Sequence, residues 1–105
     1  YKLLGRFMET FDKKGIKTVT YVCLKFPSDS ACSRFLQDTQ MLLDARVLRF
    51  DKSKTELSLL FVNEGEPEAL RQLERAGVTD SMVAEVRPFD YDYGGPLAQQ
   101  LKAYL

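Results

Sequence analysis

The sequence predicts a single α+β domain built around an antiparallel sheet, and three observations lead to this class. The chain has 105 residues, which is enough for about one compact domain. Stretches with helical spacing of apolar side chains alternate with short runs rich in β-branched and aromatic residues. Two of these runs are apolar on both faces and two are not, as expected for the central and edge strands of one sheet.

The chain starts with the pattern of a helix that leads into a buried strand. One helical face is apolar, and a basic turn with Gly15 as the stop follows it. That face consists of Leu3, Leu4, Phe7, Met8 and Phe11. Residues 16–26 are rich in β-branched and aromatic side chains of both parities, so we expect a strand covered on both faces.

A second helix and a hairpin are predicted next. Pro27 ends the strand, and Ser28 or Ser30 provides the N-cap of a helix. The apolar face of this helix consists of Cys32, Phe35, Leu36, Leu42 and Leu43. Residues 47–50 alternate with arginine like an edge strand, whereas residues 57–62 form a more buried strand. The polar residues 51–54 form the turn between these two strands.

The last part of the chain contains a helix, a strand, a loop and a closing helix. Pro67 suits the first turn of a helix that ends at Gly77. Its narrow apolar face consists of Leu70, Leu73 and Ala76. Residues 83–89 form a strand that Pro88 confines to an edge of the sheet, and residues 90–95 form a loop. Helical spacing returns in a final helix that docks on the domain, at Leu97, Leu101, Tyr104 and Leu105.

The order of these elements specifies a sheet topology. Between the two terminal helices, the elements follow the βαββαβ plan of a ferredoxin-like sheet. In that plan the first and third strands are central, and residues 16–26 and 57–62 are the two runs that are apolar on both faces. We therefore expect a ferredoxin-like antiparallel sheet with an additional helix at each end, in one domain over residues 1–105.

Composition excludes several classes of function. Fifteen Lys and Arg balance fifteen Asp and Glu, so the basic surface of a nucleic-acid binder is missing, and so is the usual attraction to a membrane surface. Histidine is absent, which removes every Ser–His and Cys–His nucleophile pair. No glycine-rich phosphate loop is present, and Cys23 has no identifiable base beside it. We predict no catalytic residue, no metal site and no cofactor.

The cysteines and the hydropathy pattern point to a compartment. Cys23 and Cys32 are too few for a disulfide framework or a zinc ribbon, so we expect both to be reduced and buried. No apolar run approaches the roughly 18 residues that cross a bilayer, and no signal peptide precedes the first helix. The sequence predicts a cytoplasmic domain, and the missing initiator Met indicates a segment of a longer protein.

A few side chains remain as candidates for ligand binding. Arg87 and Asp90 form an RxxD pattern, whose guanidinium and carboxylate match the guanine and phosphate edges of a cyclic dinucleotide. Arg46 and Arg49 lie earlier in the chain, but their odd separation places them on different faces of a strand. Asp90 and Asp92 lack the spaced carboxylates and the bidentate Glu of a calcium loop, so a solvated turn is favoured there.

From residue 3 to residue 62 the chain resembles a GGDEF, or diguanylate cyclase, domain. In that family a helix that ends in basic residues and glycine leads into a very apolar first strand, as residues 3–15 and 16–26 do here. A capped helix then runs into an Arg–aromatic pair at the signature hairpin, and residues 42–50 resemble that approach. Residues 66–77 correspond to the helix after the hairpin.

Carried over to this chain, the functional positions of the family are mostly lost. The signature glycines and acidic residues are replaced by Asp51-Lys52-Ser53-Lys54-Thr55-Glu56. The metal-binding carboxylates of the first strand fall near Cys23 and Lys25, and a thiol and an ammonium do not replace oxygen ligands for magnesium. The inhibitory RxxD ahead of the signature is also missing, since Met41 stands three residues before Asp44. The resemblance implies a degenerate, non-catalytic domain, similar to those in exopolysaccharide-regulating receptors of the Pel type.

Three hypotheses of function follow. The first is a regulatory domain that works by contact with a protein partner or by self-association, through the polar hairpin and the aromatic-acidic loop. The contact residues would be Asp51, Lys52, Lys54, Tyr91 and Tyr93. The second is a sensor of a cyclic dinucleotide, cyclic di-GMP, or of another small effector. Its contacts would be Arg46, Arg49, Arg87 and Asp90. The third is a generic ferredoxin-like interaction domain.

Overall fold

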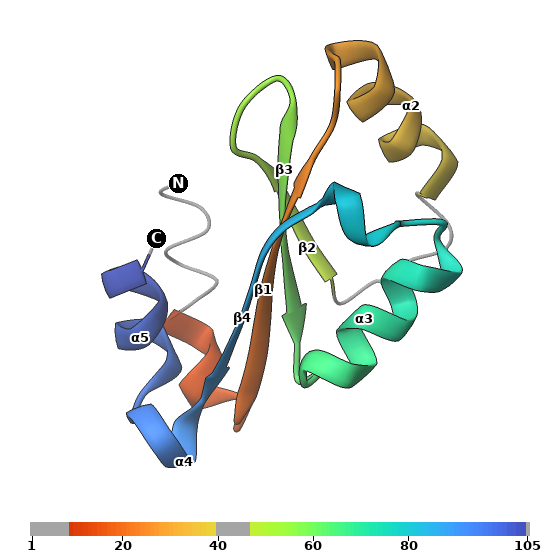
Figure 1. The fold of residues 1–105 in the computed structure, drawn as a ribbon. Coiled ribbons are helices and arrows are strands. Elements are labelled where there is room, and N and C mark those ends of the chain that lie inside the picture. Colours follow the sequence, from red (N-terminus) through yellow and green to blue (C-terminus); the bar gives the residue numbers. More distant parts are fainter. Residues whose placement is uncertain (1–8, 40–46, 105) are drawn as a thin grey trace.

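A computed structural model describes residues 9–39 and 47–104 of the chain (Figure 1). The fold is α+β, with a four-stranded antiparallel sheet in the order β2-β3-β1-β4. The strands are β1 Thr18–Lys25, β2 Val47–Asp51, β3 Glu56–Val62 and β4 Val83–Asp90. The helices are α2 Asp29–Thr39, α3 Glu66–Arg75, the 3₁₀ helix η1 Asp80–Met82, α4 Tyr91–Gly94 and α5 Leu97–Tyr104. Residues 9–13 are helical as well.

The positions of the strands in the sheet follow their apolar patterns. β1 and β3 lie at the centre and β2 and β4 lie at the edges. β1 pairs with β3 from Val19, opposite Val62, to Lys25, opposite Glu56. Pro88 lies on the edge strand β4, where a missing N–H is tolerated. The predicted central and edge strands are therefore confirmed.

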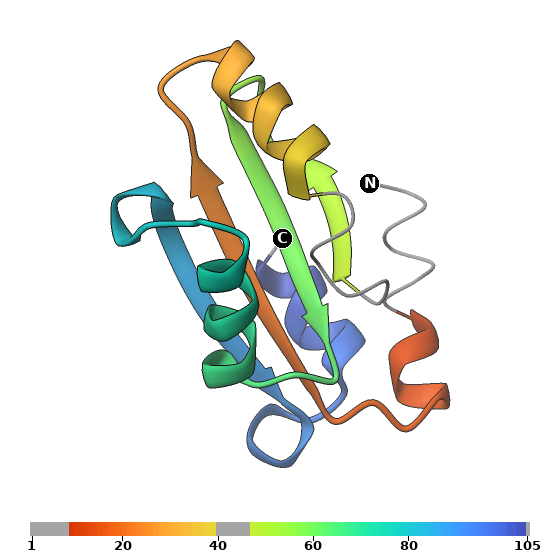
Figure 2. The ribbon, with the colours of Figure 1, turned by 90° about the vertical axis from the view of Figure 1, so that its right-hand side faces the viewer.

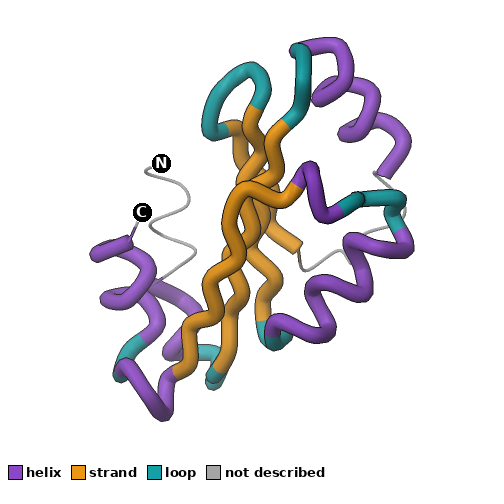
Figure 3. Tube along the Cα trace, viewed as in Figure 1, coloured by secondary structure: helices purple, strands orange, loops and turns teal. Residues whose placement is uncertain are grey.

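Helices cover both faces of the sheet (Figures 1 and 2). This explains why the central strands carry apolar side chains at both odd and even positions. α2 and α3 pack on one face, and the helix at residues 9–13 packs with α5 on the other, as the tube in Figure 3 also shows. The first face buries Val22, Leu24, Leu57, Leu59 and Phe61 of the central strands. The second face buries Val19, Tyr21, Cys23, Leu60 and Val62.

The closing helix docks on the sheet, as predicted, and polar contacts tie it to the helix at residues 9–13. Leu97 and Leu101 of α5 are fully buried. The Asp12 carboxylate accepts the backbone N–H of Leu97 at 3.1 Å and that of Ala98 at 3.5 Å. Residues from the two ends of the described chain thus form one layer beside the sheet.

Several predicted elements differ in detail from the observed ones. The expected loop at residues 90–95 is wrong, because residues 91–94 form the one-turn helix α4. Asp90 caps this turn by accepting the N–H of Asp92 at 2.9 Å, and Gly95 ends it with φ +78°. Asp51 was expected in the hairpin turn but is the last residue of β2. The 3₁₀ helix η1 was not predicted at all.

Parts of three predicted helices lie outside the described residues. This applies to Leu3, Leu4, Phe7 and Met8 of the first helix, to Leu42 and Leu43 of the second, and to Leu105. Over residues 9–39 and 47–104, none of the helices combines the length and the apolar character needed to cross a membrane.

Candidate functional site

The two described arginines that were expected to bind a small effector, Arg49 and Arg87, do not come together. Arg46 lies outside the described residues. Arg49 lies on β2 and Arg87 on β4, at opposite edges of the sheet, so three strand spacings of about 4.8 Å, or roughly 14 Å, separate their backbones. Arg49 stands opposite Leu59 and shares its sheet face, whereas Arg87 stands opposite Tyr21 on the other face.

The two members of the RxxD pattern have different structural roles. The Arg87 guanidinium lies over the ring of Tyr104, 4.6 Å from its centroid, and 5.7 Å from that of Phe89. Asp90 caps α4 and also accepts a hydrogen bond from the Thr18 hydroxyl at 3.3 Å. Because Arg87 and Asp90 are three positions apart, an odd number, their side chains start from opposite faces of β4. They form no shared pocket for a nucleotide edge.

The central strand β1 carries a buried thiol, that of Cys23. The Cys23 thiol donates to the Glu56 carboxylate at 3.7 Å, and Glu56 lies 3.9 Å from the Lys52 ammonium. Burial is the main cause that raises the pKa of Cys23. A protonated thiol is a poor nucleophile and a poor metal ligand at neutral pH. Beside it, the Tyr21 and Ser58 hydroxyls form a buried hydrogen bond of 3.1 Å.

The polar hairpin is a tight connection with exposed lysines. The backbone N–H groups of Lys52 and Ser53 both donate to the Glu56 carbonyl, at 3.0 and 3.2 Å. The side chains of Lys52 and Lys54 are exposed, and Lys52 extends toward Glu56 across the turn. Asp51 pairs with Leu57 at the end of β2. Of the three contact residues predicted at this hairpin, Asp51, Lys52 and Lys54, the structure shows the two lysines to be exposed.

The described residues offer no cluster of metal ligands. Among residues 9–39 and 47–104, no three or more His, Cys, Asp and Glu side chains are grouped so that they could hold a metal ion. Of the two carboxylates in the predicted aromatic-acidic loop, that of Asp90 caps α4.

The α4 turn presents aromatic side chains on a fixed backbone. The Gln100 side chain donates to the carbonyls of Asp90 and Gly95, at 3.0 and 2.8 Å. The backbone N–H of Tyr91 donates to the Lys17 carbonyl at 2.8 Å, and the Lys17 ammonium lies 4.2 Å from the Tyr91 ring centroid. Tyr93 is 93% exposed, so almost its whole side chain faces solvent. Tyr91 and Tyr93 are both exposed, and they lie on the helix α4 instead of the predicted loop.

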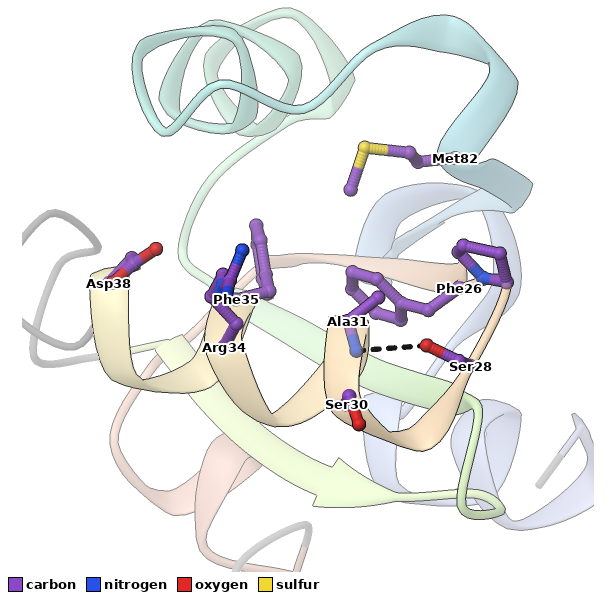
Figure 4. Close-up of a pocket in the computed structure, with 9 residues that line it drawn as sticks. Phe26, Ser28, Ser30, Ala31, Arg34, Phe35, Asp38 and Met82 are labelled. Carbon is purple, nitrogen blue, oxygen red and sulfur yellow. Dashed lines mark hydrogen bonds between the residues drawn. The ribbon is translucent and has the colours of Figure 1, made fainter.

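A hollow of about 510 Å³ beside α2 was not predicted from the sequence (Figure 4). Its walls come from the end of β1, from one stripe of α2 and from η1. Phe26, Ala31, Phe35 and Met82 supply apolar surface, and Arg34 and Asp38 supply opposite charges. The α2 stripe could have been found from its i, i+3, i+4, i+7 spacing, but nothing local in the sequence places Met82 against it.

Comparison with protein-family models, with curated proteins and with solved structures gives no match for this chain.

Proposed function

We propose that this chain is a non-catalytic regulatory domain, related in plan to GGDEF domains, that works by contact with another protein of a signalling or secretion system. Two observations support the absence of catalysis. Cys23 is buried, and burial raises its pKa, near the position where the resemblance to a cyclase would put a metal-binding carboxylate. The hairpin that would carry the signature consists of residues 52–55, with exposed lysines and no glycine.

The strand arrangement and the connections between strands both bear on the fold class. We place the sheet in the ferredoxin-like class because β1 and β3 are central and β2 and β4 are edges. The connections support this assignment as well, since α2 follows β1 and α3 follows β3, and both helices pack on one face. A cytoplasmic location is supported by Cys23 and Cys32, which are both buried, form no disulfide and lie on opposite faces of the sheet.

The observation that carries the contact function is the exposure of Tyr93. A tyrosine binds with a large, amphipathic surface and few rotatable bonds, so it is often an energetic anchor of an interface. The backbone that presents it is held by the Asp90 cap and by both Gln100 hydrogen bonds. Because α4 is already ordered, little conformational entropy is lost when a partner binds there.

The proposal is tested by site-specific photo-crosslinking in cells that make this protein. A photoreactive phenylalanine analogue is placed at Tyr93, and a matched one at Glu74, an exposed position of α3. We expect one protein to crosslink at position 93 and not at position 74, and to co-purify less with Tyr93→Ala than with Tyr93→Phe. Equal crosslinking at both positions, or unchanged co-purification of Tyr93→Ala, would count against contact through α4.

A further inference from the structure

We propose that the hollow beside α2 binds a free α-amino acid with a large apolar side chain. The hollow is bounded by Phe26, Phe35 and Met82 and carries Arg34 and Asp38 on its rim (Figure 4). Figure 1 places α2 and α4 at opposite ends of the molecule, so this site is separate from the contact surface at Tyr93.

The apolar part of the hollow suits a large side chain. The rings of Phe26 and Phe35 have centroids 5.2 Å apart and are tilted by 45°, so they present ring faces and edges to the same space. Met82 lies across from them, and its flexible, polarizable thioether adapts to aliphatic and aromatic groups alike. The volume of about 510 Å³ lies within the range of about 300–1,000 Å³ that is usual for small-molecule sites.

The rim carries one charge of each sign at a fixed spacing. Arg34 and Asp38 are one helical turn apart on α2, in the same stripe as Phe35, so their Cβ atoms are about 5–6 Å apart. Both side chains are exposed, and neither has an ion pair or hydrogen bond within the part of the chain that the structure describes. The guanidinium fork of Arg34 fits a carboxylate, and the Asp38 carboxylate fits an ammonium group.

Two opposite charges beside an apolar hollow select a zwitterion over a simple ion. A plain anion would pair with Arg34 but would be repelled by the nearby Asp38 carboxylate. A plain cation would pair with Asp38 but would be repelled by the Arg34 guanidinium. An α-amino acid carries both charged groups on one carbon, from which the side chain extends. Its carboxylate and ammonium would then lie on the rim while the side chain enters the space between Phe35 and Met82.

Isothermal titration calorimetry with the complete chain tests this assignment. The probes are L-phenylalanine, L-leucine and L-methionine, together with glycine, 3-phenylpropionate and phenethylamine. We expect at least one of the three apolar amino acids to bind. We expect glycine and the two analogues that lack one charged group to bind at least about tenfold more weakly, since each loses a charge-assisted hydrogen bond or the apolar contact.

Conservative variants provide the second arm of the experiment. Arg34→Gln and Asp38→Asn keep the shape of α2, and each is expected to lower the affinity about tenfold. Glu74→Gln, on the exposed face of α3, is the matched control and should bind like the unchanged protein. Thermal unfolding of all three variants shows whether each one is folded.

Three results would overturn the proposal. The first is no binding of any apolar amino acid at millimolar concentrations, and the second is equal binding of 3-phenylpropionate and L-phenylalanine. The third is unchanged affinity in both Arg34→Gln and Asp38→Asn. Should a variant fail to fold, NMR on the unchanged protein decides, because the bound amino acid must shift the Met82 methyl and Ala31 signals. Shifts confined to other residues would also overturn it.

Discussion

Replacing Asp12 by alanine is expected to loosen α5, because this carboxylate accepts two of the N–H groups at the start of that helix. The contacts measure 3.1 Å to Leu97 and 3.5 Å to Ala98, and they join residues 85 and 86 positions apart. Loss of a capping side chain costs about 0.5–2 kcal/mol. Since the second contact is long, we expect a loss of about 1 kcal/mol, which corresponds to about 4–8 °C in Tm for a domain of this size.

The assay is thermal and urea unfolding followed by circular dichroism, combined with amide hydrogen exchange at Leu97 and Ala98. Asp12→Asn keeps one acceptor oxygen and should fall between the unchanged protein and Asp12→Ala. Lys13→Ala, at the next, exposed position, is the control and should leave both measurements nearly unchanged. If Asp12→Ala unfolds like Lys13→Ala and the two amides keep their protection, the capping of α5 by the helix at residues 9–13 is refuted.

Three further predictions concern the core and the titrating side chains. Burial is the main cause that raises the pKa of Tyr104 to about 12 from 10.0. The folded state therefore holds this proton more tightly than the unfolded chain, and stability should fall between about pH 10 and pH 12. In urea unfolding over this range, the free energy of unfolding should depend less on pH for Tyr104→Phe than for the exposed control Tyr93→Phe. Identical pH dependence in both variants would exclude the titration of Tyr104 as the cause. Cys23 is 1% exposed and its pKa is raised by burial, so Ellman's reagent should label it slowly in the native protein and rapidly in urea. Leu73→Ala should cost about 2–5 kcal/mol, whereas Leu70→Ala on the exposed side of α3 should cost less than about 1 kcal/mol; equal losses in urea unfolding would mean that α3 packs differently.

The arrangement of the sheet was predictable because a strand buried on both faces has apolar residues at consecutive positions in the sequence. Tyr21 and Cys23 face one layer of helices while Val22 and Leu24 face the other, so every position from 19 to 24 must exclude water. Such a run fits only a central strand with helices on both faces. Pro88 identified β4 as an edge strand, because proline lacks the N–H group that a central strand needs for pairing.

The candidate sites were less predictable because they depend on pairing between distant segments. The pairing of Arg49 with Leu59 and of Arg87 with Tyr21 sets the two arginines on different faces, and no local pattern encodes this register. The α4 turn is too short to show helical periodicity. The hollow beside α2 requires Met82, which comes from another part of the chain.

The claim that this fold works by contact and not by catalysis is tested most directly by GTP turnover. The protein is incubated with GTP and magnesium, and cyclic di-GMP is measured by mass spectrometry against a blank without protein. Under the proposed relation to GGDEF domains, the metal-binding carboxylates of the first strand would fall near Cys23 and Lys25, which are not oxygen ligands, so we expect no product above the blank. Magnesium-dependent formation of cyclic di-GMP that is abolished by Glu56→Gln would contradict the proposed function.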